Sequence, residues 1–163
     1  MEPSENAFEM IKAWEGLHCR AYKALPSECY YTIGYGHCSP EVKKGQYITV
    51  KEAEQLLKND VAQYSQLLAA VNPTLLQHQY DALISLIYNI GWHNFITSMT
   101  GVVTSSLNRK TTPIDVARRI ILWVRSGGKV ILGLQRRRVM EANYFLGYEC
   151  FTLEDGTIYE HDL

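Results

Sequence analysis

The chain has 163 residues, of which 47% are hydrophobic and 20% are charged, and its formal net charge is −1. This length suits about one domain with its own core, and the composition excludes a disordered or collagen-like chain. No apolar run approaches the ~20 residues of a bilayer-spanning helix, and the polar segment Met1–Glu5 is unlike a secretory signal. We therefore expect a protein that is made in a cytoplasm and has no membrane span.

The first predicted element is an amphipathic helix over residues 4–15. Apolar residues recur there at helical spacing, Ser4 is typical of an N-cap, and Gly16 is typical of the residue that ends a helix. Residues 20–48 are rich in Tyr, Gly, Thr and Pro instead, and Tyr30–Gly36 has the aromatic and β-branched content of strands. We predict a β-hairpin or a three-stranded sheet in this segment.

Helical patterns account for most of the remaining chain. Thr49 and Glu52 fit a capping box, and residues 79–90 are apolar enough for a buried central helix. Further helices are predicted near residues 96–108, 113–125 and 133–146, with the Gly127–Gly128 pair ending the second of them. The predicted fold class is α+β, with a small β-rich lobe at about residues 20–48 inserted after the first helix and a larger helical lobe behind it.

Charge is distributed unevenly along the second half of the chain. Residues 109–138 contain nine Lys or Arg and one acid, whereas residues 148–163 contain five acids and no Lys or Arg. The basic stretch could face a polyanion such as a bacterial wall, but solvated helix faces that pair with each other are the simpler explanation. We interpret residues 1–147 as one domain and residues 148–163 as an acidic C-terminal tail. A net charge near zero argues neither for nor against nucleic acid, and we expect none as a partner.

Cysteine and histidine give no metal pattern. Without a secretory signal, free thiols are the default for Cys19, Cys29, Cys38 and Cys150. The spacing of Cys29, His37 and Cys38 matches no known zinc motif. We therefore expect neither a metal nor another cofactor.

The first residue with a chemical signature is Glu15. It lies in the last turn of the first predicted helix, at the negative end of the helix dipole and next to Trp14. Both features favour the protonated carboxyl, which is the form a general acid needs. A solvated glutamate at a helix end is the alternative.

The surroundings of Glu15 resemble the phage-type lysozymes, the muramidase family of phage endolysins. The similarity runs in order from about Phe8 to Leu146, and its most specific part is the Tyr31–His37 run (Y-T-I-G-Y-G-H) after Glu15-Gly16. Further matching segments are Ala21–Lys23, Ile48–Val61, Gln79–Gly91, Gly128–Arg138 and Glu141–Ala142. The resemblance implies a lysozyme-like fold with a cleft between the two lobes and Glu15 at its mouth.

The resemblance also implies roles for single residues. Glu15 stands at the general acid, and Thr32 at the threonine that positions the attacking water. The substrate would be the β-1,4 bond between N-acetylmuramic acid and N-acetylglucosamine in peptidoglycan. His37 and Asp60 stand at an ion pair that ties the β-lobe to the long helix. Residues 136–138, three arginines, either approach the cleft or anchor the last helix, and we expect anchoring.

One position departs from the family pattern. Where the family usually carries an aspartate, this chain has Ala24, and the loop to Thr32 is two residues longer. Inverting glycosidases need a second carboxylate ~6.5–9.5 Å from the acid. Glu28 is the only acid in the loop, and we expect it to supply this group, although Glu15 and Thr32 acting without it, or a catalytically dead wall-binding protein, remain alternatives.

The remaining predictions concern two tyrosines, the partners of the protein and its alternative functions. Tyr22 and Tyr35 could line the sugar cleft, and core packing explains them equally well. We expect a monomeric endolysin that stays in the host cytoplasm until a holin opens the membrane to the wall. The alternative functions are an impaired wall-binding protein and a lytic transglycosylase, which products with 1,6-anhydromuramoyl ends would reveal.

Overall fold

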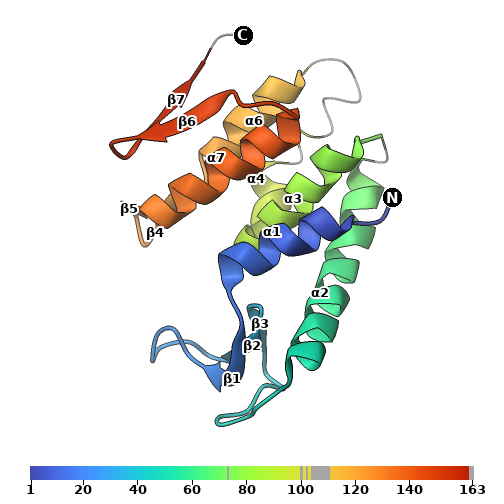
Figure 1. The fold of residues 1–163 in the computed structure, drawn as a ribbon, viewed down its shortest axis with the longest axis vertical. Coiled ribbons are helices and arrows are strands. Elements are labelled where there is room, and N and C mark those ends of the chain that lie inside the picture. The colour runs from blue at the N-terminus through green and yellow to red at the C-terminus, as the bar shows by residue number, and fades with distance from the viewer. Residues whose placement is uncertain (73, 100, 102, 104–110, 162–163) are drawn as a thin grey trace.

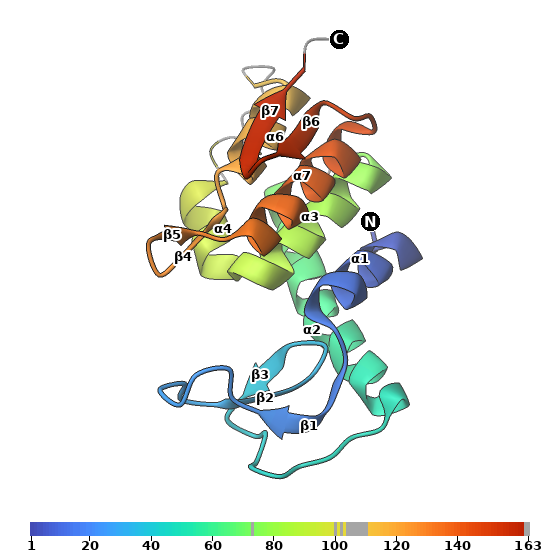
Figure 2. The same ribbon diagram turned by 60° about the vertical axis from the view of Figure 1, so that its left-hand side comes forward.

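The computed structural model describes residues 1–72, 74–99, 101, 103 and 111–161, which form two lobes (Figure 1). The small lobe contains a three-stranded sheet, the large lobe is helical, and the long helix α2 runs from one to the other (Figure 2). This is the α+β architecture predicted from the sequence. In chain order the elements are α1 (Glu5–Glu15), β1 (His18–Tyr22), β2 (Tyr31–Gly34), β3 (His37–Ser39), α2 (Val50–Val71), α3 (Gln77–Ile90), α4 (Trp92–Ser98), α6 (Pro113–Ile121), β4 (Arg125–Ser126), β5 (Lys129–Val130), α7 (Leu132–Leu146), β6 (Phe151–Glu154) and β7 (Thr157–Glu160).

The helix α1 begins and ends where the sequence predicts. The Ser4 hydroxyl accepts a hydrogen bond from the backbone N–H of Asn6, and the Gly16 N–H donates to the Lys12 carbonyl over 3.0 Å. These contacts satisfy backbone groups that a helix end leaves without an intrahelical partner. Glu15 is therefore the last residue of the helix, directly before the chain turns into the sheet.

The sheet of the small lobe is antiparallel in the order β1–β2–β3. Tyr22 lies opposite Thr32, and Thr32 lies opposite Cys38. Because directly opposed residues in an antiparallel sheet point to the same face, these three side chains share one face. The next pair, Ile33 and His37, points to the other face, on which Ile33 is fully buried.

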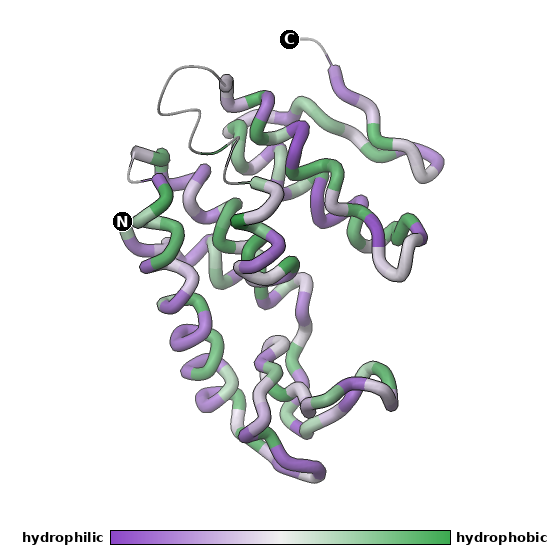
Figure 3. Tube along the Cα trace, turned by 180° about the vertical axis from the view of Figure 1, so that it is seen from behind, coloured by the Kyte–Doolittle hydropathy of each residue, from purple (hydrophilic) through white to green (hydrophobic). Residues whose placement is uncertain are grey.

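The long helix α2 carries the small lobe on its first half. The predicted capping box is present, because the Thr49 side chain accepts from the Glu52 N–H and the Glu52 carboxylate accepts from the Thr49 N–H over 2.7 Å. Hydrophobic and hydrophilic turns alternate along this helix (Figure 3). Its buried residues, Ala53 and Leu57 among them, belong to the same core cluster as Ile33 of the sheet.

The central helix α3 is buried along most of its length, as the sequence predicts. Every residue from Tyr80 to Ile87 is buried, and the helix contacts α1, α2, α4 and α7. Helices α6 and α7 confirm the predicted helices at 113–125 and 133–146 in part. The predicted helix near 96–108 overlaps the end of α4 (Trp92–Ser98), and residues 100, 102 and 104–108 of that prediction lie outside the described residues.

The prediction for Gly127 and Gly128 was wrong. Helix α6 ends at Ile121, and the two glycines form the two-residue turn between the short strands β4 and β5. Their φ angles of 55° and 79° are both positive, which is the backbone that a tight turn of type I′ requires. The two glycines therefore form the turn of a hairpin and do not end a helix.

The C-terminal segment folds back as a hairpin on the helical lobe. Strands β6 and β7 pair with each other, and Phe151 at the start of β6 is buried with Cys150. The Asn143 amide oxygen of α7 accepts from the backbone N–H groups of both residues. Arg118 Nη2 of the basic stretch lies 2.7 Å from Glu160 Oε1 of the acidic segment, so the two segments pair at this point. The division of the chain at residue 147 stays a prediction.

Two polar contacts join the lobes. His37 Nδ1 lies 2.8 Å from Asp60 Oδ2 of α2, which confirms the ion pair that the family resemblance implied. The Tyr88 hydroxyl of α3 donates to the Tyr35 carbonyl of the small lobe over 2.7 Å. Within the described ranges, no helix has both the length and the apolar character that crossing a bilayer requires.

The His37–Asp60 pair predicts a pH-dependent stability. The hydrogen bond to Asp60 raises the pKa of His37 above its ordinary value of 6.5. The ion pair therefore stabilises the folded state fully at pH values below 6.5, and this stabilisation is lost as pH rises through the pKa that His37 has in the folded state. We expect Asp60→Asn to lower the free energy of unfolding by about 1–2 kcal/mol near pH 6.

Urea unfolding of the wild type and the Asp60→Asn variant across this pH range tests that expectation. The difference between the two proteins should shrink as pH rises towards 9. His37→Gln should show the same loss and should abolish the pH dependence. A difference that grows with pH would contradict the assignment.

Candidate active site

Glu15 lies at the junction of the two lobes and is held by an arginine. Its Oε1 is 2.6 Å from Nη1 of Arg137 in α7, and the side chains are 21% and 4% exposed, respectively. Its other oxygen lies against Gly36, where an added Cβ would be 3.4 Å from Oε2. One carboxyl oxygen is thus fixed by a cation, and the other lies at the turn between β2 and β3.

Arg137 is itself fixed from behind. Its Nε donates to Glu141 Oε1 over 2.9 Å, and its Nη2 donates to the Ser85 carbonyl over 3.1 Å. The Ser85 hydroxyl donates to the same Glu141 oxygen over 2.7 Å. The guanidinium therefore has a set orientation, which joins α1, α3 and α7 at the candidate acid.

The three neighbouring arginines have three different environments. Arg138 is fully buried, contacts Glu141 and Asn89, and donates to the Trp123 carbonyl. Burial lowers the pKa of Arg138, and the charge of Glu141 opposes this shift. The sequence predicted that all three arginines anchor the last helix. Arg138 has this role, whereas Arg137 also contacts Glu15. Arg136 lines a separate cavity.

Thr32 lies on the sheet face that also carries Tyr22. The pKa of Tyr22 is raised by its burial and then by the negative charges of Glu15 and Glu28. Tyr22 therefore lies within electrostatic reach of both predicted acids, one from each lobe, and Thr32 is its cross-strand neighbour. The catalytic roles of these residues stay predictions.

Glu28 folds back onto the position where the family usually carries its aspartate. Glu28 Oε2 accepts a hydrogen bond from the Ala24 N–H over 2.9 Å, and Lys23 Nζ donates to the Glu28 carbonyl over 2.6 Å. These two contacts close the longer loop on itself. They bring the Glu28 carboxylate to the backbone of Ala24, and the side chain is half-buried.

Tyr35 has a different environment from Tyr22. It is 9% exposed and belongs to the core cluster, with Lys12 Nζ 5.9 Å from its ring centroid. This geometry favours the packing explanation that the sequence analysis left open for Tyr35. Tyr22, half-buried on the face of Thr32, stays the better candidate for a sugar contact.

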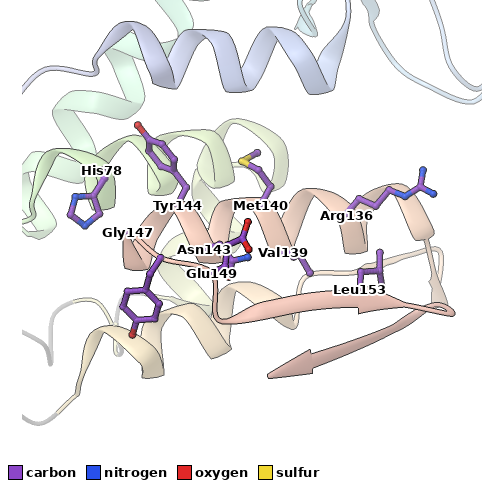
Figure 4. Close-up of a pocket in the computed structure, with 10 residues that line it drawn as sticks. His78, Arg136, Val139, Met140, Asn143, Tyr144, Gly147, Glu149 and Leu153 are labelled. Carbon is purple, nitrogen blue, oxygen red and sulfur yellow. The ribbon is translucent and has the colours of Figure 1, made fainter. Parts of the chain in front are cut away.

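A cavity of about 520 Å³ lies where the small lobe meets α2 and α3. It is lined by Gly36, His37, Asp60 and Tyr88, among others, so it adjoins Glu15 through Gly36. A second cavity of about 710 Å³ lies along α7, between His78 at one end and Arg136 at the other (Figure 4). None of the predicted catalytic residues lines this second cavity.

No group of three or more His, Cys, Asp or Glu side chains that could hold a metal ion occurs in the part of the chain that the structure describes. All four cysteines are free thiols.

Comparisons with known proteins agree on one family. The family model described as phage lysozyme matches residues 12–141. An endolysin of Bacillus phage PZA is 40% identical over 146 residues, which cover 89% of this chain and 55% of the relative. An endolysin of Salmonella phage P22 is 35% identical over 143 residues, which cover 85% of this chain and 94% of the relative. Among solved structures, the muramidase domain of SpmX from Asticaccaulis excentricus has a TM-score of 0.77 at 30% identity and covers 89% of this chain and 97% of that one.

The two lobes and the acid at their junction define a domain of the lysozyme-like class. The chain belongs to the phage lysozyme family. It spans about half the length of the two Bacillus phage endolysins that it matches.

From the sequence, a place near the cleft was only the less favoured alternative for Arg137, and Glu141 was not predicted to belong to the site. A local signal was present, because arginine and glutamate four residues apart share one helix face. That spacing is also typical of exposed pairs, and the contact with Glu15 spans 122 positions of the chain.

The contact between Gly36 and Glu15 predicts a sensitive position. Gly36 has φ +93°, which strains any other residue, and a Cβ there would be in van der Waals contact with Glu15 Oε2 at 3.4 Å, so relaxation of the strained turn would shift the backbone against Glu15. We expect Gly36→Ala to lower the free energy of unfolding by about 1–2 kcal/mol and the wall-lytic rate by about tenfold.

Gly45→Ala is the matched control for this substitution. Gly45 also has a positive φ, of +78°, but an added Cβ would meet nothing within 4 Å. The control should lose stability and keep its rate of lysis, measured as clearing of a wall suspension well below both melting temperatures. Equal losses of rate in the two variants would contradict the proposed contact.

Proposed function

We propose that this chain hydrolyses the β-1,4 bond between N-acetylmuramic acid and N-acetylglucosamine in peptidoglycan. The observation that carries the proposal is the geometry of Glu15, whose Oε1 is held by Arg137 while Oε2 lies at the junction of the lobes. Family membership and the printed description of the SpmX relative as a muramidase domain support the same chemistry.

In the proposed reaction, the protonated Glu15 carboxyl gives its proton to the glycosidic oxygen as the bond from that oxygen to the anomeric carbon breaks. A water molecule attacks the anomeric carbon from the opposite face and forms the new carbon–oxygen bond. The water loses a proton to a second carboxylate. Arg137 stabilises the Glu15 carboxylate that remains.

Glu28 is the proposed second carboxylate. Its support is the hydrogen bond from the Ala24 N–H, which holds the carboxylate beside the backbone of the residue that stands where the family usually carries an aspartate. The shared electrostatic influence of Glu15 and Glu28 on Tyr22 is a second, independent support. Thr32, next to Tyr22 in the sheet, would hold the water between them.

The biological setting is part of the proposal. As a phage endolysin, the protein would wait in the host cytoplasm as a monomer until a holin gives it access to the wall. Peptidoglycan is its proposed partner. The alternatives are an impaired wall-binding protein and a lytic transglycosylase, and the second differs in its products.

Glu15→Gln should lower the rate of wall hydrolysis by a factor of at least ~10², because the amide has no acidic proton to donate. The amide oxygen still accepts a hydrogen bond from Arg137, so the variant should fold. Glu9→Gln is the matched control, since it makes the same change on the same helix at an exposed side chain. Turbidity of a purified wall suspension measures both variants.

Full lysis by Glu15→Gln would remove the general-acid assignment. A wild-type protein that binds walls without releasing reducing ends would favour the wall-binding alternative. Release of 1,6-anhydromuramoyl ends would favour the transglycosylase.

Glu28→Gln should lower the rate by ~10² to ~10⁴ with little loss of wall binding, as expected for the loss of a general base. The amide oxygen can still accept from the Ala24 N–H, so the loop should keep its shape. Adding Ala24→Asp to this variant should recover part of the rate. Hydrolysis by Glu28→Gln at the wild-type rate would leave Glu15 and Thr32 acting without a protein base.

A further inference from the structure

Four charged side chains form one connected cluster behind the site. Glu15, Arg137, Glu141 and Arg138 are linked in that order by ion pairs. The side chains of Glu141 and Arg138 are fully buried, and that of Arg137 is 4% exposed. A buried charge is tolerated only when it is paired and hydrogen-bonded, so each member depends on its neighbours.

Glu141 is the member that determines where Arg137 points. The guanidinium group is planar, so fixing Nε and Nη2 also fixes the direction of Nη1. Glu141 fixes Nε and the Ser85 carbonyl fixes Nη2, and Nη1 then contacts Glu15. The Ser85 hydroxyl, which donates to Glu141 Oε1, holds the glutamate in turn.

We propose that Glu141 is a positioning residue for the acid, acting through Arg137 to hold the Glu15 carboxyl where it can protonate the substrate. The inference rests on the proposed role of Glu15. It goes beyond that role because Glu141 contacts Arg137, Arg138 and Ser85 and reaches Glu15 only through the arginine.

Glu141 has a second effect on the transfer of the proton from Glu15, through the charge balance of the cluster. With all four groups ionised, two positive and two negative charges cancel. When Glu15 is protonated, one positive charge is left over, and transfer of that proton to the leaving oxygen restores the balance. Without Glu141, the two arginines and the ionised Glu15 would leave the cluster with a net positive charge.

The charge of Glu15 also acts on Tyr22 from β1 and on Tyr88 from α3. Burial raises the pKa of both phenols, so both stay neutral near neutral pH and leave the balance of the cluster unchanged.

The test uses Arg138→Met as a common background. Arg138 does not contact Glu15, and its removal leaves the bonds of Arg137 in place while avoiding an unpaired buried arginine when Glu141 is changed. Arg138→Met/Glu141→Leu removes the acceptor of Arg137 Nε. Arg138→Met/Glu141→Gln keeps an acceptor oxygen but no charge. The three proteins thus differ at position 141 only.

The readouts are kcat and KM for release of reducing ends from solubilised glycan strands, measured well below each melting temperature. The kcat of Arg138→Met is the reference value for both double variants. The Glu141→Leu double variant should fall ~10-fold to ~10²-fold below this background, with KM changed less than about threefold. The Glu141→Gln double variant should lie between them.

Equal kcat values in the background and both double variants would overturn the inference, because a merely structural glutamate would change the melting temperature alone. If the leucine variant does not fold, Ser85→Ala decides the question. It removes one hydroxyl donor to Glu141 without changing charge, and we expect a kcat lowered ~3-fold to ~10-fold at constant KM. An unchanged kcat in Ser85→Ala would then overturn the inference.

Glu15→Gln, assayed in parallel, distinguishes a failure of the proposed acid from a failure of the proposed positioning role of Glu141. Activity retained by Glu15→Gln means that the proposed acid is wrong, whatever the variants at position 141 show. An inactive Glu15→Gln together with fully active variants at position 141 means that the acid is right and the positioning role is wrong.

Discussion

The ion pair between Glu15 and Arg137 is the contact on which the site depends. It joins the last residue of α1 to α7, and the partners of Arg137 add α3 to the same point. A nearly buried guanidinium must have its hydrogen bonds satisfied, so these three helices cannot separate there without exposing unpaired donors. The contacts that hold the helical lobe together are therefore the same ones that orient the candidate acid.

The sequence predicted the elements that carry a local signature. The N-cap at Ser4 and the capping box at Thr49 are local hydrogen bonds, and the high apolar content of α3 indicates a largely buried helix. Arg137 has no such signature, because its environment comes from residues distant in the chain. Spacing alone assigns Arg137 and Glu141 to one helix face but does not say whether that face is exposed, and here it is the buried one.

The hairpins were harder to predict for a different reason. Strands β4 and β5 have two residues each, which is too short for any alternation to be detected, so the Gly127–Gly128 pair was taken as the end of a helix. In the C-terminal hairpin, all the charged residues are acidic, which favoured the interpretation as a solvated tail. Phe151 and Ile158 nevertheless pack against the core, and alternation over strands of four residues was too short to outweigh the charge.

The candidate acid and the candidate water-binding groups belong to different lobes. Glu15 is fixed to the helical lobe by Arg137, whereas Thr32 and Glu28 belong to the small lobe. The small lobe in turn packs on the first half of α2 and is joined to the large lobe by the contacts of His37 and Tyr35. The distance between acid and water is therefore a property of the contacts between lobes. Asp60 and Tyr88, which make the polar contacts between the lobes, therefore help to set the distance between Glu15 and the candidate groups of the small lobe.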